Sequence, residues 1–179
     1  MSAIIIPFFP SYGRDVDQIT RTEQLVNAAW KFAQCALWAE QSFSRDDEDA
    51  TKEYIREYFI AANNDKRAFI ALIQRIVLTQ KYANRTSDRF LPSPSVWFNR
   101  RYPFGFAGTL NWLRNVEQQR KEVPGYLAHI QALADGYYRY TVKPTKKSFD
   151  RCRASLLEHK APILLQLFYT TVAHTSNRA

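Results

Sequence analysis

The sequence predicts an all-α protein: one bundle of about six or seven helices that forms a single domain over residues 1–179. Apolar residues recur at spacings of three and four along the chain, and no run alternates cleanly enough for a strand. Capping residues and prolines stand where these apolar patterns begin. The 179 residues are 46% hydrophobic and 15% aromatic, which suffices for one packed core.

The first helix is expected from Thr20 to about Phe43, because Thr20 and Glu23 form the pattern Thr-x-x-Glu of a capping box. A second helix is expected from the stretch SRDDEDATKEYIREYF, residues 44–59. Its four consecutive acids fall in the first turn, where they stabilise the positive end of the helix dipole. The acids lack the alternating spacing and central glycine of a calcium loop, so no metal is expected there.

A third helix is predicted from about Asp65 to Tyr82, after Asn63 and Asn64 interrupt the pattern. Its apolar residues form one stripe, which we expect to face the core. The stripe consists of Phe69, Ile70, Ile73, Ile76 and Val77. The cations of this helix are candidates for a binding face: Lys66, Arg67, Arg75 and Lys81.

An irregular connector that contains proline and glycine is predicted near residues 84–108. Pro92 and Pro94 push the residues before them toward extended geometry, so FLPSPS is expected to run as a stiff strut. Trp97 follows, and its large indole is expected either to pin the connector onto the bundle, together with Trp112, or to stack on an unpaired base.

Arg100 and Arg101 come directly after these aromatic residues. Arginine next to aromatic rings is one way in which proteins hold phosphates while bases stack, so both are candidate nucleic-acid contacts. Gly108 and Thr109 stand at a predicted helix start, where free amide N–H groups donate hydrogen bonds either to an ordinary cap or to an anion.

The fourth helix is expected to begin at Thr109 and to end at about Val123, where Pro124 is expected to stop it. A fifth follows to about Tyr140. Thr145 is expected to cap a sixth helix, which carries several Lys and Arg side chains beside its apolar positions. The last helix is expected near residue 161, with Pro162 in its first turn, where a missing amide hydrogen costs nothing.

The composition predicts a soluble, cytoplasmic protein without a cofactor. The apolar start MSAIIIPFFP lacks a basic beginning and a cleavage site, and no stretch reaches the roughly 18 apolar residues of a membrane-spanning helix. Cys35 and Cys152 each fall in a helical pattern and predict buried thiols. His129, His159 and His174 lack the spacing of a zinc motif.

No catalytic constellation is found, and we expect a protein without enzymatic activity. The sequence has no G-x-S-x-G elbow and no glycine-rich phosphate loop. Glu53 and Glu57 lie one helical turn apart, but Lys52 and Arg56 flank them, and a solvated helix face accounts for all four.

Charge is distributed unevenly along the chain, whose formal net charge is +8. Residues 1–62 carry six Lys and Arg against ten Asp and Glu, a net charge of −4, whereas residues 63–179 carry nineteen against seven, a net charge of +12. A positive excess on one part of a small domain indicates a surface that meets a polyanion, and nucleic acid is the commonest one.

The stretch RFLPSPSVWFN resembles the Ile-Pro-x-Pro-Ser-x-Trp-Leu-Asn segment of phage and plasmid replication proteins, among them replisome organisers and helicase-loader-like proteins. The residues that match are Leu91, Pro92, Pro94, Ser95, Trp97 and Asn99, with Val96 where threonine is usual and Phe98 where leucine is usual. GFAGTLNW and RKEVPGY are similar to versions from bacterial mobile elements, and the whole resemblance covers roughly residues 52–126. It implies a replication context and no chemistry.

Two interpretations follow from these observations. The first is a non-enzymatic accessory protein of a mobile element that binds nucleic acid, DNA rather than RNA, or a replication protein. Its expected contacts are Arg100, Arg101, Lys143, Lys146, Lys147, Arg151 and Arg153. The second is a helical scaffold that binds another protein, or a further copy of itself, through its oppositely charged parts.

Overall fold

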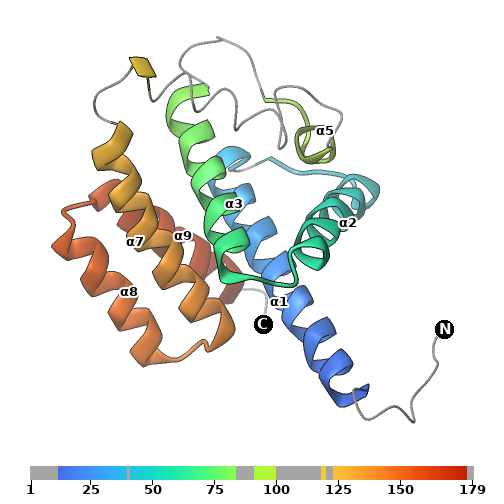
Figure 1. The fold of residues 1–179 in the computed structure, drawn as a ribbon. Helices are drawn as coiled ribbons and strands as arrows, with labels where there is room; N and C mark the ends of the chain where they lie inside the picture. The colour runs from blue at the N-terminus through green and yellow to red at the C-terminus, as the bar shows by residue number, and fades with distance from the viewer. Residues whose placement is uncertain (1–11, 40, 84–90, 100–117, 120–122, 177–179) are drawn as a thin grey trace.

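The computed structural model describes residues 12–39, 41–83, 91–99, 118–119 and 123–176. This part of the chain is all-helical, with seven α-helices packed together and no strand, which confirms the predicted fold class (Figure 1). Its elements are α1 (Tyr12–Leu37), α2 (Arg45–Ala61), α3 (Lys66–Leu78), the π-helix η1 (Thr79–Ala83), α5 (Pro94–Phe98), α7 (Val123–Val142), α8 (Lys146–Glu158) and α9 (Pro162–Ser176). Within these ranges, no helix has the length and apolar character needed to cross a bilayer.

The long helix α1 lies at the centre of the fold and packs against α2, α3, α7 and α9. Helices α7 and α8 form an antiparallel pair on one side of it, and α2 with α5 lies on the opposite side (Figure 1). Helix α3 runs antiparallel to α7, since Lys66 at its start pairs with Asp135, and Gln74 further along hydrogen bonds to Gln131.

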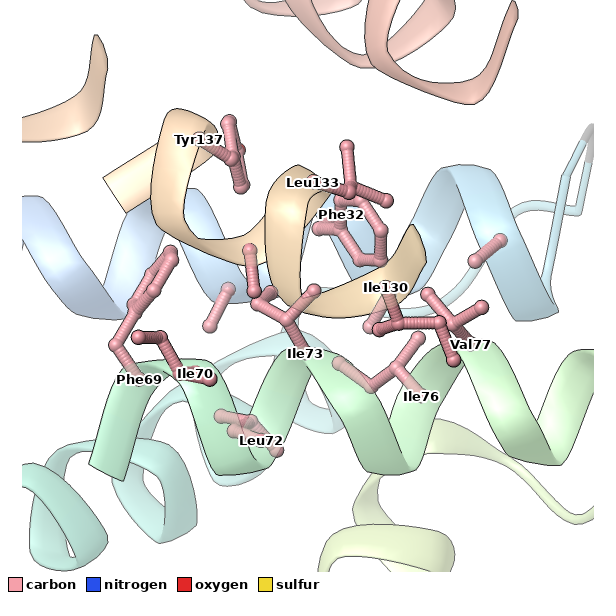
Figure 2. Packing of buried hydrophobic residues seen from close by; sticks show 14 of the residues in the cluster. Phe32, Phe69, Ile70, Leu72, Ile73, Ile76, Val77, Ile130, Leu133 and Tyr137 are labelled. Carbon is pink, nitrogen blue, oxygen red and sulfur yellow. The ribbon is translucent and has the colours of Figure 1, made fainter. Parts of the chain in front are cut away.

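The core is built where α1, α3 and α7 meet, and the predicted apolar stripe of α3 is buried there. Figure 2 shows Ile73 and Val77 of α3 facing Ile130 of α7. Tyr137 of α7 is also buried, and its hydroxyl donates a 2.9 Å hydrogen bond to the carbonyl of Ala28 in α1. Burial raises the pKa of Tyr137 above its ordinary value, so this phenol stays neutral and keeps its donor proton.

Local sequence signals account for the segment from α2 to α3. Ser44 caps α2 by accepting a 3.1 Å hydrogen bond from the amide of Asp47, and three of the four predicted acids, Asp46, Asp47 and Glu48, stand in its first turn. Asn63 and Asn64 adopt left-handed φ angles of 54° and 57°, which end the helix as predicted. Asp65 then caps α3 by accepting a hydrogen bond from the amide of Arg67.

The predicted start of the first helix is wrong. Thr20 lies inside α1, which begins at Tyr12 and ends at Leu37 rather than at Phe43. The Thr-x-x-Glu pattern therefore caps nothing, because Glu23 instead accepts hydrogen bonds of 2.6 and 2.9 Å from Arg56 of α2. The side-chain hydrogen bond from Arg56 lowers the pKa of Glu23, and this contact joins α1 to α2.

Pro124 stands in the first turn of α7, which begins at Val123, because a proline in the first turn loses no intrahelical hydrogen bond. The end of the helix expected before it falls on residues outside the described ranges and stays a prediction. The same reasoning applied to Pro162 is confirmed, since α9 begins there. Thr145 caps α8 as predicted. The helix predicted over 109–123 lies outside the described residues, except for residues 118–119, which are helical, and Val123.

Candidate nucleic-acid interface

Residues Leu91–Asn99, called the clamp below, fix the described part of the connector to α1 and α2. The carbonyl of Pro92 accepts a 3.0 Å hydrogen bond from Nε1 of Trp38 at the end of α1. At the other end of the clamp, Nδ2 of Asn99 donates a 3.1 Å hydrogen bond to the hydroxyl of Tyr54 in α2. These bonds tie both ends of the segment to helices about fifty residues earlier in the chain.

The middle of the clamp is held by aromatic packing. Trp97 is 0% exposed, and its ring centroid lies 6.1 Å from that of Trp38 and 4.7 Å from that of Phe98, in edge-to-face arrangements. Between the two prolines and this tryptophan, the hydroxyl of Ser95 donates a hydrogen bond to the carboxylate of Asp47. The buried Trp97 ring is unable to stack on a base, so its place in the fold is that of a core clamp.

The predicted extended strut is correct only as far as Ser93. Ser93 has φ −59° and ψ 157°, which is extended, but Pro94 begins the short helix α5, which carries Trp97 and Phe98 into the core. A proline at the first helical position is favourable, and it is buried here. The other connector candidates lie outside the described residues, and their predictions stay predictions: Arg100, Arg101, Gly108, Thr109 and Trp112.

Helix α8 and the turn before it carry five exposed cations, called the basic ridge below: Lys143, Lys146, Lys147, Arg151 and Arg153. A capping box starts this helix, because Thr145 Oγ1 accepts from the amide of Ser148 and Ser148 Oγ accepts from the amide of Thr145, both at 3.1 Å. Lys146 and Lys147 then occupy the first turn, which contains no acid.

The packing of α8 sets the direction in which the basic ridge points. Cys152 and Leu156 are buried, and Cys152 lies against Gly136 of α7, where an added Cβ would stand 2.5 Å from its Sγ atom. This close approach requires glycine. Lys147 and Arg151 are four residues apart and therefore share one face, turned away from the buried residues toward solvent. Burial also raises the pKa of the Cys152 thiol to about 12, so this cysteine is inert.

The cations of the basic ridge differ from those of α3 in having few intramolecular partners. Lys146 lies 3.9 Å from Asp150 with its side chain 92% exposed, a geometry that contributes little stability. The other four ridge cations form no ion pair with any acid of the described ranges. In α3, by contrast, Lys66 contacts Asp135 at 2.5 Å and Arg67 contacts Asp65 at 2.9 Å.

Lys81 of η1 is also engaged, because its ammonium lies 3.6 Å from the centre of the Tyr126 ring. Arg75 is largely buried, and its pKa is lowered by desolvation. Of the predicted binding face on α3, Lys66 and Lys81 contact other parts of the fold and Arg67 pairs with the neighbouring Asp65, and the face stays a prediction. Sequence spacing gave no sign of these partners, which come from distant segments for Lys66 and Lys81.

The fold also brings together two histidines that sequence spacing did not predict to be neighbours. His129 of α7 and His159 at the end of α8 lie 30 residues apart in the sequence, yet their ring centroids are 5.8 Å apart. Their proximity follows from the antiparallel packing of α7 and α8. No third metal-ligating side chain joins them, since the described residues contain no group of three or more.

Comparison of this chain with protein-family models, with curated proteins and with solved structures finds no match in any of the three. The described part of the chain is a helical bundle with a buried clamp and an exposed basic ridge.

Proposed function

We propose that this protein binds nucleic acid, DNA in preference to RNA, through the basic ridge, as a non-enzymatic accessory protein of the phage or plasmid replication type. The proposal rests mainly on one observation: Lys143, Lys147, Arg151 and Arg153 are exposed and form no ion pair within the described residues. Their charge is therefore available to phosphates. The resemblance of the clamp sequence to replication proteins favours DNA over other polyanions.

The position of the lysines supports a role outside the fold. The amino end of a helix carries a partial positive charge, so each cation in the first turn costs about 0.3 to 1 kcal/mol. Lys146 and Lys147 both stand in the first turn of α8, and no acid offsets them there. A ligand with closely spaced negative charges is attracted both by the lysine side chains and by the partial positive charge of the helix end.

The expected mode of binding is charge neutralisation with weak sequence preference. Lysine acts as a point charge toward a phosphate, and the described ridge presents no Asn or Gln that would read a base edge. Each phosphate that a cation neutralises releases condensed counterions, and the release drives binding. Affinity therefore falls as salt concentration rises.

The test is a titration of labelled single- and double-stranded DNA at several salt concentrations from about 50 to 200 mM. If about four to six cations engage, log K against log salt falls with a slope of roughly −4 to −5 on duplex DNA. The double substitution Lys146→Ala with Lys147→Ala is expected to flatten this slope by about 2.

A matched control removes two positive charges at side chains that already form ion pairs within the protein. Lys52→Ala with Arg67→Ala deletes two cations that contact Glu48 and Asp65, and it is expected to leave the slope nearly unchanged. A parallel pair, Arg100→Ala with Arg101→Ala, tests the connector arginines. Absence of binding at about 50 mM salt, or binding that does not respond to salt, would contradict the proposal.

A further inference from the structure

The outward face of α2 is a row of acids that ends in an aliphatic side chain. Asp46, Asp49, Glu53 and Glu57 are all exposed, and their spacing of three or four residues places them on one side of the helix. Ile60 follows on the same side in the last turn, and it is 59% exposed. A large aliphatic side chain that remains this exposed beside four acids indicates a face prepared for contact.

A groove lies beside Ile60, between α1 and the end of α2. Ile19 of α1, which is 64% exposed, stands across the groove from Ile60, and both line it. The ion pair between Glu23 and Arg56 also lines it and joins the two helices. The groove therefore offers an apolar entrance to a side chain such as leucine.

The outward face of α8 carries a net positive charge, because the five ridge cations outnumber the acids Asp150 and Glu158 of the same helix. The basic ridge occupies its first turns, and Leu157, which is 56% exposed, follows in the last turn. Ile60 comes eleven residues after Asp49, and Leu157 comes eleven residues after Lys146. Eleven residues of helix span about 16 Å in both cases, so Asp49 and Lys146 lie at the same distance from the aliphatic side chain of their own helix.

These two faces are unable to meet within one chain. Helix α8 packs on α7 and α9, helix α2 packs on α1 and α5, and Figure 1 shows α2 and α8 on opposite sides of the molecule. Contact between them requires two molecules.

We infer that a second copy of this chain is the partner of the α2 face: α8 of one copy lies parallel to α2 of the next, and Leu157 enters the groove beside Ile60. Opposite charges facing each other steer the encounter and fix the register, and the aliphatic contact adds buried apolar area. The inference does not depend on nucleic-acid binding.

The geometry of this contact determines the kind of assembly. The two surfaces are different, so each added copy leaves one free α2 face and one free α8 face, and copies join head to tail into chains or closed rings. The basic ridge serves both the second copy and the proposed DNA contact. A polyanion is therefore expected to compete with self-association.

The first experiment measures mass by sedimentation velocity across protein concentrations at low salt. Asp49→Lys with Glu57→Lys, and separately Lys147→Glu with Arg151→Glu, are each expected to raise the dissociation constant by about tenfold or more. None of these four side chains forms an ion pair within the described residues, so the fold is expected to tolerate the changes.

The decisive variant carries all four substitutions. It has the formal net charge of the native chain, and the substituted positions again place opposite charges on the two faces, so association is expected to return. If the variant with four substitutions stays monomeric while the native chain associates, the two faces do not pair. A native chain that stays monomeric at low salt and high concentration overturns the inference as well.

The aliphatic part has its own test and control. Leu157→Ser is expected to weaken association, whereas Ile163→Ser, at a position in α9 that is 72% exposed, is expected to leave it unchanged. Equal effects of the two would contradict the seating of Leu157 in the groove.

The DNA titration separates the two proposals. Asp49→Lys with Glu57→Lys leaves the basic ridge intact, so it is expected to weaken self-association by about tenfold or more without weakening DNA binding. Loss of both activities in this variant would contradict the inference. If the native chain self-associates but binds no DNA, the nucleic-acid proposal is contradicted and the inference on self-association is not.

Discussion

The clamp and the basic ridge were the two candidate nucleic-acid regions of the sequence, and the fold treats them in opposite ways. Polar groups of the clamp bond to the protein itself: the carbonyl of Pro92 to Trp38, Ser95 to Asp47 and Asn99 to Tyr54. In the basic ridge, Lys147 and Arg151 are exposed and form no ion pair within the described residues.

The difference shows that composition alone does not identify a binding surface. Aromatic, proline and polar residues that the fold buries or hydrogen bonds are no longer available to bind a ligand. The groups that can bind a ligand are the charged side chains that form few contacts within the fold. The two regions should therefore respond differently to substitution. The clamp is expected to change stability, whereas the ridge is expected to change binding.

The largest expected effect is that of Trp97→Ala in the clamp. Trp97 is fully buried against Trp38 and Phe98, so truncation removes a large apolar surface and leaves a cavity. We expect the free energy of unfolding to fall by about 3 to 5 kcal/mol, measured by urea denaturation. A loss below about 1 kcal/mol would mean that the clamp is not part of the core.

The next effect concerns the packing that orients the basic ridge. Gly136→Ala places a Cβ atom 2.5 Å from Sγ and 2.8 Å from Cβ of Cys152, and the overpacking is expected to cost about 1 to 3 kcal/mol. Adding Cys152→Ala removes only the Sγ contact, so we expect thermal denaturation to show partial recovery. Full tolerance of Gly136→Ala alone would show that α7 and α8 are not so closely packed.

A smaller effect is expected at the end of the clamp. Asn99→Ala removes the side-chain donor to Tyr54, a loss of about 1 kcal/mol in the free energy of unfolding. Tyr54→Phe removes the other partner, and the double variant is expected to lose less than the sum of the two single losses. Additive losses in this double-mutant cycle would show that the two side chains do not interact.

The smallest effect has the opposite sign and belongs to the ridge. Lys146→Glu with Lys147→Glu places acids in the first turn of α8, where they favour the helix dipole, so each change is expected to raise stability by about 0.3 to 1 kcal/mol. The same variant is expected to lose DNA binding. A variant that is both destabilised and unable to bind would mean that the lysines serve the fold.

Much of the fold followed from local signals. The helix starts near Ser44 and Asp65, the cap at Thr145 and the interruption at Asn63 and Asn64 depend on neighbouring residues, and all agree with the structure. The described residues contain seven α-helices, and six or seven were predicted for the chain, but the two sets are not the same. Helix α5 was not predicted, and the helix predicted over 109–123 lies outside the described residues except for residues 118–119 and Val123.

The error at the first helix occurred where a distant partner decided the outcome. Glu23 had a neighbour suited to capping, but Arg56 of another helix binds it instead. A pattern along the chain does not reveal this, because the competing contact lies elsewhere in space.

The sequence by itself determined the helical class, most helix starts and the division of charge, because caps, apolar periodicity and net charge are properties of neighbouring residues. Only the tertiary structure decided which groups were left available to a ligand. Trp97 was buried and Lys66 was paired with Asp135, while Lys147 and Arg151 stayed exposed. The physical reason is that burial and ion pairing depend on which helices pack together, and α3 packs on α7 through residues far apart in the sequence, such as Lys66 and Asp135.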